Sequence, residues 1–323
     1  MNPALLRVED LKVGFDTDLG RVNAVHGVSF SLKSGEILGI AGESGCGKSV
    51  TALSIIRLLP QPVARILQGS IIYRDTNLLS LPSDEMHRIR GKKISMIFQE
   101  PMTALNPVHG IGRQLTEIYT LHFPGMTPTQ QWDRAMEMLG KVGIPDPGLV
   151  MKKYPHQLSG GMRQRVMIAM ALACEPDILI ADEPTTALDV TVQAQILELI
   201  RGLQRQIGMS VILITHDLGV IAQNCDEVMV MYAGQVAEFA PVKSLFLSPS
   251  HPYTQGLLQA IPSRATQAKS PLPTIKGNVP SLLEMSPGCR FADRCPRVRD
   301  ICTMEIPPKK AIGERHIAHC HLL

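Results

Sequence analysis

A glycine-rich stretch near the N-terminus has the residue types of a phosphate-binding loop. Its sequence matches the pattern G-x-x-x-x-G-K-[ST], in which glycines let successive N–H groups turn inward around phosphate oxygens. A helix starting at the end of the loop would direct its positive N-terminal end toward the same anion. The lysine would reach the β- and γ-phosphates of a nucleotide, and the serine hydroxyl would bind Mg²⁺. The predicted nucleotide-binding residues here are Gly42, Glu43, Ser44, Gly45, Cys46, Gly47, Lys48, Ser49 and Val50.

Two carboxylates follow an apolar segment much later in the chain. Asp182 and Glu183 come directly after Ile178 to Ala181, which is predicted to be a buried strand. Asp182 is suited to bind Mg²⁺, and Glu183 to polarise the water that attacks a γ-phosphate. Such a pair alone could be a solvated turn, but a phosphate loop in the same chain favours a nucleotide-hydrolysing site.

The segments around these residues predict an α/β core. Apolar strands are predicted at 36–41, 94–98, 178–181 and 211–214, and helices at 49–59, 162–174 and 190–207. Buried parallel strands separated by helices are typical of this fold class. Alternating residues predict two half-buried strands at 11–15 and 28–32. Helical stretches broken by prolines predict a helical subdomain at about 100–160, inserted into the core.

Four of the seven cysteines lie near the end of the chain, at Cys289, Cys295, Cys302 and Cys320. Four thiolates are sufficient for a tetrahedral zinc site or a [4Fe–4S] cluster. The gaps between them are wide and lack the C-x-x-C pairs common in zinc sites. Buried cysteines without a metal are the alternative.

A serine- and glycine-rich stretch supplies the evidence for a family. Leu158-Ser159-Gly160-Gly161 resembles the LSGGQ signature of ATP-binding-cassette (ABC) ATPases, although Met162 stands where that family has glutamine. Three other motifs of this family occur in the expected order, namely the glutamine loop, the aspartate loop and the switch histidine. The corresponding residues are Gln99, Ala187-Leu188-Asp189 and His216.

This resemblance implies a P-loop NTPase core of the ABC type, with an inserted helical subdomain and a small Cys-rich C-terminal extension. It also implies a head-to-tail dimer, in which each ATP lies between the phosphate loop of one subunit and Ser159, Gly160 and Gly161 of the other. Gln99 would sense Mg²⁺ or water, and His216 would contact the γ-phosphate. Phe15 would stack on adenine, with a plain core phenylalanine as the equal alternative.

Two C-terminal stretches, 251–258 and 287–296, resemble the oligopeptide and dipeptide importer ATPases. The resemblance implies a nucleotide-binding domain over 1–262 and an extension over 263–323, and it favours a [4Fe–4S] cluster over zinc at the four cysteines. The implied partners are two membrane permeases, a second ATPase subunit (a copy or an F-type homologue) and, indirectly, an extracytoplasmic peptide-binding protein. The implied location is the cytoplasmic face of the bacterial inner membrane. Import of nickel or another small solute is the alternative.

Composition favours no other class of function. The chain of 323 residues has a net charge of only +3, which gives no indication of a nucleic-acid partner. No apolar run approaches the roughly 18 residues that span a bilayer. A soluble ABC ATPase of translation or DNA repair is disfavoured, because those proteins usually carry two cassettes or a long coiled coil.

Overall fold

The computed structural model describes residues 4–99, 104–186, 189–261, 273–283 and 285–323. The chain divides into two compact units. One comprises Met1–Lys33, Ile37–Ser80 and Leu213–Leu323, and we call it the P-loop unit because it contains the phosphate loop. The other comprises Ser34–Glu36 and Leu81–Ile212, and we call it the signature unit. Among the described residues, no helix is both long and apolar enough to cross a bilayer.

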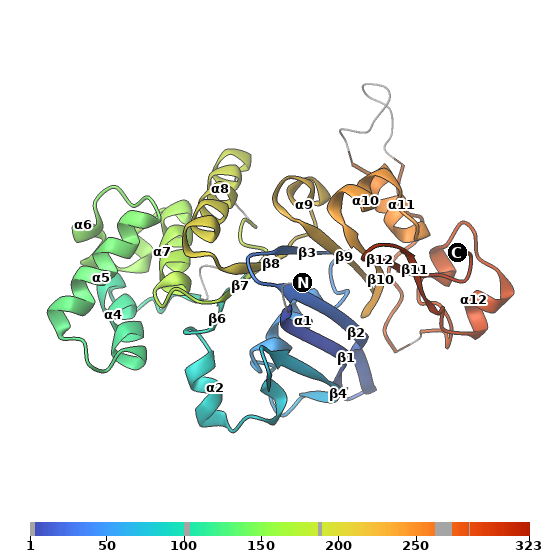
Figure 1. Ribbon diagram of the computed structural model, residues 1–323, viewed down its shortest axis with the longest axis horizontal. Helices are drawn as coiled ribbons and strands as arrows, with labels where there is room; N and C mark the ends of the chain where they lie inside the picture. The colour runs from blue at the N-terminus through green and yellow to red at the C-terminus, as the bar shows by residue number, and fades with distance from the viewer. Residues whose placement is uncertain (1–3, 100–103, 187–188, 262–272, 284) are drawn as a thin grey trace. The chain divides into compact units, whose positions relative to one another are not determined.

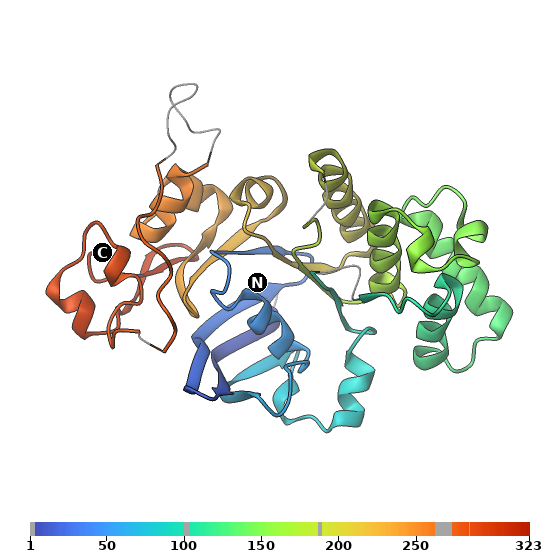
Figure 2. The same cartoon turned by 180° about the vertical axis from the view of Figure 1, so that it is seen from behind.

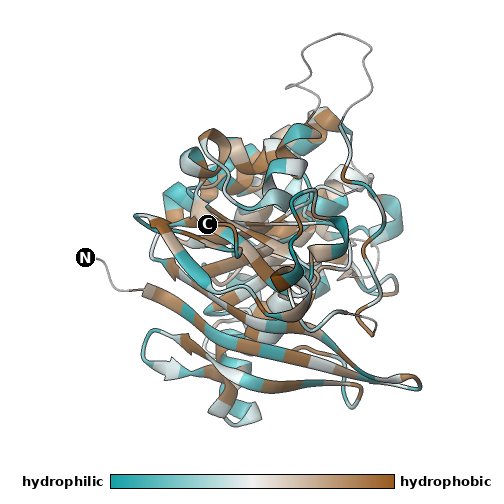
Figure 3. Cartoon of the chain, turned by 90° about the vertical axis from the view of Figure 1, so that its right-hand side faces the viewer, coloured by the Kyte–Doolittle hydropathy of each residue, from teal (hydrophilic) through white to brown (hydrophobic). Residues whose placement is uncertain are grey.

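The P-loop unit contains a four-stranded antiparallel sheet with the strand order β2-β1-β4-β5. Its strands are β1 (Ala4–Thr17), β2 (Gly20–Lys33), β4 (Ala64–Tyr73) and β5 (Thr76–Asn77). Hydrophobic and hydrophilic residues alternate along the long strands (Figure 3), as expected for strands with one buried face. The two predicted strands at 11–15 and 28–32 lie inside β1 and β2, which extend further in both directions.

The second sheet of this unit has the order β11-β12-β10-β9-β3, and only β3 and β9 are parallel neighbours. The strands are β3 (Ile37–Ala41), β9 (Glu227–Tyr232), β10 (Gln235–Pro241), β11 (Lys309–Gly313) and β12 (His316–His319). Figures 1 and 2 show three helices on one side of β3, β9 and β10, and the four-stranded sheet on the other. These helices are α9 (Leu218–Asn224), α10 (Val242–Leu247) and α11 (Pro252–Gln259).

Helix α1 (Lys48–Ile55) begins directly at the end of the phosphate loop. It is shorter than the predicted helix at 49–59, because the chain leaves the helical conformation at Ile56 and Arg57 adopts a φ of +53°. The last helix of the unit, α12 (Asp300–Met304), lies in the C-terminal extension.

The signature unit pairs two parallel strands, β6 (Ile94–Ile97) and β7 (Ile178–Asp182). Its helices are α2 (Ser83–Ile89), α4 (Ile111–His122), α5 (Pro128–Lys141), α6 (Pro147–Met151), α7 (Gly160–Leu172) and α8 (Val190–Ile207). Helices α4, α5, α6 and α7 pack against one another (Figure 1), and the first three fall within the range predicted for the helical insertion. Strand β8 (Ser210–Ile214) carries the chain from the signature unit to the P-loop unit.

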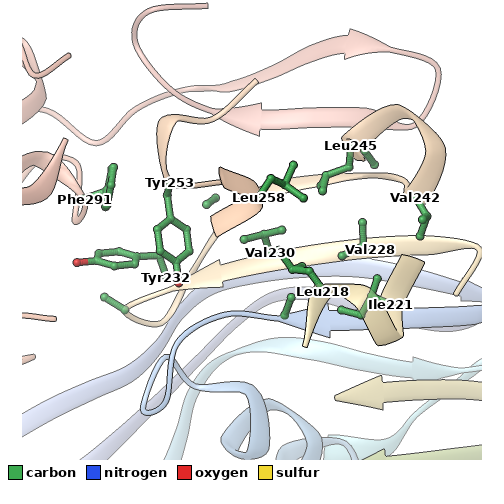
Figure 4. Close-up of a cluster of buried hydrophobic side chains, with 14 residues drawn as sticks. Leu218, Ile221, Val228, Val230, Tyr232, Val242, Leu245, Tyr253, Leu258 and Phe291 are labelled. Carbon is green, nitrogen blue, oxygen red and sulfur yellow. The ribbon is translucent and has the colours of Figure 1, made fainter. Parts of the chain in front are cut away.

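A hydrophobic cluster forms the core of the P-loop unit around β9, β10 and α9 to α11 (Figure 4). It includes Tyr232 from β9, Tyr253 from α11 and Phe291 from the C-terminal extension. The extension therefore shares a core with the strands that follow the nucleotide-binding segments. The predicted boundary between 262 and 263 stays a prediction.

Candidate functional site

The phosphate loop adopts a backbone that only glycine accommodates at two of its positions. Gly42 has a φ of +149° and Gly47 a φ of +98°, values that L-residues rarely adopt. A Cβ at Gly42 would lie 2.2 Å from the carbonyl oxygen of Met231, and one at Gly47 would lie 2.6 Å from that of Ala24. Glycine is therefore required at both positions for two reasons, namely the positive φ and the close approach of backbone carbonyl oxygens.

Lys48 is held inside this loop. Its ammonium donates hydrogen bonds to the carbonyl oxygens of Gly42 at 2.8 Å and Glu43 at 3.1 Å, and the residue is 5 % exposed. Two backbone hydrogen bonds hold the following turn, from Thr51 N–H to Gly47 O and from Gly234 N–H to Cys46 O, both at 2.9 Å. The cation is thus placed at the start of α1, where an incoming phosphate would meet it.

The remaining loop residues differ in exposure. Ser44 and Gly45 are exposed, and Ser49 and Val50, in the first turn of α1, are partly exposed. Cys46 is buried, and this burial raises the pKa of its thiol. A protonated, buried thiol packs as a small apolar group, and the Lys48 ammonium lies 3.9 Å from the Cys46 sulfur.

The acidic half of the predicted site lies in the signature unit. Asp182 ends β7 and is only 3 % exposed. The Glu183 carboxylate accepts hydrogen bonds from the Gln99 amide at 3.2 Å and from the Thr186 hydroxyl at 2.8 Å. Gln99 follows β6, and since β6 and β7 are parallel neighbours, both residues lie at the same edge. The hydrogen bond brings Gln99 to the acid Glu183, and its role with Mg²⁺ or water stays a prediction.

Glu183 has a φ of +46°, which is unusual for a residue with a side chain. Such conformations cluster at functional sites, where the surrounding structure holds them. Thr186 was not among the residues predicted from the sequence. A hydroxyl residue three positions after Glu183 could have identified Thr186 from the sequence.

The signature stretch opens α7 as predicted. Ser159 is the N-cap, and its hydroxyl accepts a hydrogen bond from Met162 N–H at 3.3 Å. Ser159 and Gly160 are exposed, and Gly161 is partly exposed, so the positive end of a helix of 13 residues faces solvent. Sequence reasoning missed Gln164, which is buried and donates to the Pro184 carbonyl, just after the two acids Asp182 and Glu183.

Asp189 has a local structural role. It is the N-cap of α8, and its carboxylate accepts a hydrogen bond from Val192 N–H at 3.0 Å. Its side chain is exposed. Ala187 and Leu188 of the predicted aspartate loop lie outside the described residues.

His216 and Phe15 lie in the P-loop unit. His216 is exposed, between the end of β8 and Asp217, the N-cap of α9. Phe15 is partly exposed on β1 and pairs with Val22 on one side and Ala64 on the other. The roles of His216 with a γ-phosphate and of Phe15 with adenine stay predictions, as does the joint action of the phosphate loop and the acids on one nucleotide.

Comparison with known proteins identifies the family to which these features belong. Residues 25–186 match the family model described as ABC transporter. The chain belongs to the ABC transporter family. Residues 237–302 match a second model, described as the oligopeptide/dipeptide transporter C-terminal region. This cassette is an ATP hydrolase, with ATP and Mg²⁺ as its expected ligands.

Relatives and solved structures cover most of the cassette. The chain is 52 % identical to the dipeptide transport ATP-binding protein DppD of Bacillus subtilis, over 98 % of this chain and 94 % of that protein. It is 48 % identical to the oligopeptide transport ATP-binding protein OppD of Salmonella typhimurium, over 98 % and 93 %. A dimeric post-hydrolysis structure of the ATP-binding cassette MJ0796, bound to ADP and Pi, superimposes with a TM-score of 0.66 at 28 % identity, covering 73 % of this chain and 98 % of MJ0796.

The four-cysteine metal site predicted for this ABC protein is not formed in the structure. The described part of the chain holds no group of three or more His, Cys, Asp or Glu residues that could bind a metal ion. Cys302 and Cys320 are buried, while Cys289 and Cys295 are partly buried and pack against the hydrophobic cluster. Burial, together with a smaller effect of the other three thiols, raises the pKa of Cys289 to about 11. A thiol must lose its proton to bind a metal, so binding at these cysteines would depend on deprotonation.

Proposed function

We propose that this cassette powers the import of di- or oligopeptides through partner membrane permeases. The observation that supports the proposal is the match of residues 237–302 to the oligopeptide/dipeptide transporter C-terminal region. Relatives named for peptide transport extend along almost the whole chain, which agrees with this assignment. The complex would comprise two permeases and a second ATPase subunit, either a copy or a homologue, at the cytoplasmic face of the bacterial inner membrane. An extracytoplasmic protein would deliver the peptide.

Within the complex, each of the sequence motifs would have a chemical role. The Lys48 ammonium would leave its loop carbonyls to bind the phosphates, and the Ser49 hydroxyl and Asp182 carboxylate would hold Mg²⁺. Glu183, whose carboxylate is oriented by Gln99 and Thr186, would accept the proton of the attacking water. The helix start at Ser159 would bind the γ-phosphate held by the opposite subunit.

Reconstitution tests the substrate. The complete importer would be purified from its own organism's membranes, placed in proteoliposomes with the binding protein, and supplied with internal ATP and a radiolabelled dipeptide or pentapeptide outside. We expect uptake that depends on ATP and is lost when the cassette carries Glu183→Gln. Uptake of nickel but of neither peptide would refute the peptide assignment and leave the ATPase assignment intact.

We also propose that the four C-terminal cysteines bind a [4Fe–4S] cluster, with zinc as the alternative. Cys295, Cys302 and Cys320 each raise the pKa of the Cys289 thiol electrostatically. The N–H of Cys289 also donates to the carbonyl of Cys302 at 2.7 Å. Binding would require the side chains to converge and lose their protons, which couples metal affinity to pH.

Metal analysis of protein purified without oxygen tests this second proposal. We expect about four irons and four sulfides per chain, the number in such a cluster, with a brown colour that Cys302→Ser removes and Cys174→Ser keeps. Cys174 is a suitable control because it is a partly buried cysteine outside the extension. One zinc without iron would refute the cluster, and metal-free protein would refute both alternatives.

A further inference from the structure

An acidic residue of the phosphate loop is paired with an arginine of the C-terminal extension. One guanidinium nitrogen of Arg294, Nη1, lies 2.9 and 3.1 Å from the two carboxylate oxygens of Glu43. The Arg294 side chain is only 7 % exposed and that of Glu43 is 28 % exposed. Because the pair is largely shielded from water, it is screened less than a surface ion pair. The two residues are 251 positions apart in the sequence.

The backbone of Glu43 is also held by a hydrogen bond. Its N–H donates to the hydroxyl of Tyr253 at 3.0 Å, and Tyr253 is fully buried at the start of α11. Arg294 also donates to the hydroxyl of Tyr232 at 3.3 Å. The loop is thus fixed at Glu43 by both its backbone and its side chain.

Phe291, between Arg290 and Arg294, packs on the two tyrosines of this contact. The Phe291 ring lies 5.2 Å from that of Tyr232 and 5.3 Å from that of Tyr253 (Figure 4). Arg290 donates to the carbonyl of Ala233, whose neighbour Gly234 binds the Cys46 carbonyl of the loop. The extension therefore supports both halves of the phosphate loop.

The charge of Glu43 makes the pairing important for nucleotide binding. A carboxylate in a loop that receives a triphosphate repels that anion unless a cation neutralises it. The arginine supplies the neutralising charge, and its hydrogen bonds hold the loop in one conformation before the ligand arrives. A loop ordered in advance loses less conformational entropy on binding.

We propose that Arg294 is a positioning residue of the nucleotide site, through which the C-terminal extension orders the phosphate loop and neutralises Glu43. It acts through Glu43 and does not touch the nucleotide. The proposal depends on the ATPase activity of the family and is independent of which solute is transported.

Calorimetric titration of the purified full-length chain with Mg-ADP tests the proposal, because ADP binds without turnover. We expect Arg294→Ala to weaken binding about tenfold, which corresponds to about 1.4 kcal/mol. Adding Glu43→Gln to this variant should recover most of the loss, since no unpaired carboxylate then faces the phosphates.

Arg297→Ala is the matched control. Arg297 lies on the same extension and donates to Gln255 at 2.6 Å, so its removal should leave the affinity for Mg-ADP unchanged. Arg294→Lys keeps the charge and should lose about threefold or less. If Arg294→Ala does not fold, as judged by circular dichroism, the lysine variant and the double variant decide the matter. Wild-type affinity in Arg294→Ala, an equal loss in Arg297→Ala, or no recovery in the double variant would overturn the proposal.

Discussion

Replacing Gly47 by alanine should destabilise the phosphate loop much more than replacing Gly45. Both glycines have positive φ, +98° at Gly47 and +77° at Gly45, so alanine at either position costs about 1–2 kcal/mol of backbone strain. Apart from its two chain neighbours, no described residue has an atom within 4 Å of a methyl group at Gly45, whereas at Gly47 the methyl group would lie 2.6 Å from the Ala24 carbonyl oxygen. Ala24 belongs to β2 and cannot move freely.

Overpacking of this kind typically adds about 1–3 kcal/mol. We therefore expect the free energy of unfolding to fall by about 1–2 kcal/mol for Gly45→Ala and by about 2–5 kcal/mol for Gly47→Ala. Urea unfolding of the nucleotide-free protein, followed by circular dichroism, measures both values without any contribution from a ligand. If the two variants lose the same stability, the close approach of β2 does not constrain the loop, and the strain in either variant comes from φ alone.

Three further predictions concern single side chains. Glu183→Gln should reduce ATP hydrolysis by about 10²–10⁴-fold, the usual contribution of a general base, while the affinity for Mg-ATP measured by calorimetry stays the same; undiminished turnover would remove Glu183 from its role. Lys48→Ala should weaken Mg-ATP binding by about 10–100-fold, since a charge-assisted hydrogen bond contributes about 1.5–3 kcal/mol, and wild-type affinity would contradict this. Burial lowers the pKa of His251 from 6.5 to about 4, with His319 and Arg297 acting in the same direction. The unfolded state therefore binds the proton more tightly than the folded state. The free energy of unfolding should be highest above pH 6.5 and should fall as the pH drops toward 4, by about 2 kcal/mol at pH 5. His251→Asn should flatten this dependence in urea titrations at several pH values, and an unchanged slope would refute the assignment.

The sequence predicted the parts of the site that depend on local chemistry. Gly42 and Gly47 are recognisable because the loop needs their φ values, and Ser159 because it belongs to the signature stretch that opens a helix. Gln99 was assigned through its resemblance to the glutamine loop, and its hydrogen bond to Glu183 is a contact that only the structure shows.

Features that depend on distant packing could not be predicted in this way. The end of α1 at Ile55 is one such feature, because the residues up to Leu59 have helical character and the chain nevertheless turns at Arg57. Asp189 is another, since an aspartate assigned to a nucleotide-site motif also caps its own helix. For the cysteines, residue type alone does not determine whether four thiols converge on a metal or pack as apolar groups.

The acidic residue inside the phosphate loop shows most clearly what spacing alone leaves out. Glu43 occupies a position at which the loop pattern accepts any residue, and a negative charge there opposes phosphate binding. Only the folded chain brings Arg294 to it, together with the Tyr253 hydroxyl that binds its N–H. The extension that follows residue 262 begins where the sequence becomes rich in proline, yet Phe291 belongs to the core of the P-loop unit. Arg294, which neutralises Glu43, thus comes from the C-terminal extension, a segment whose composition differs from that of the cassette. Phosphate binding by the loop therefore depends on the extension.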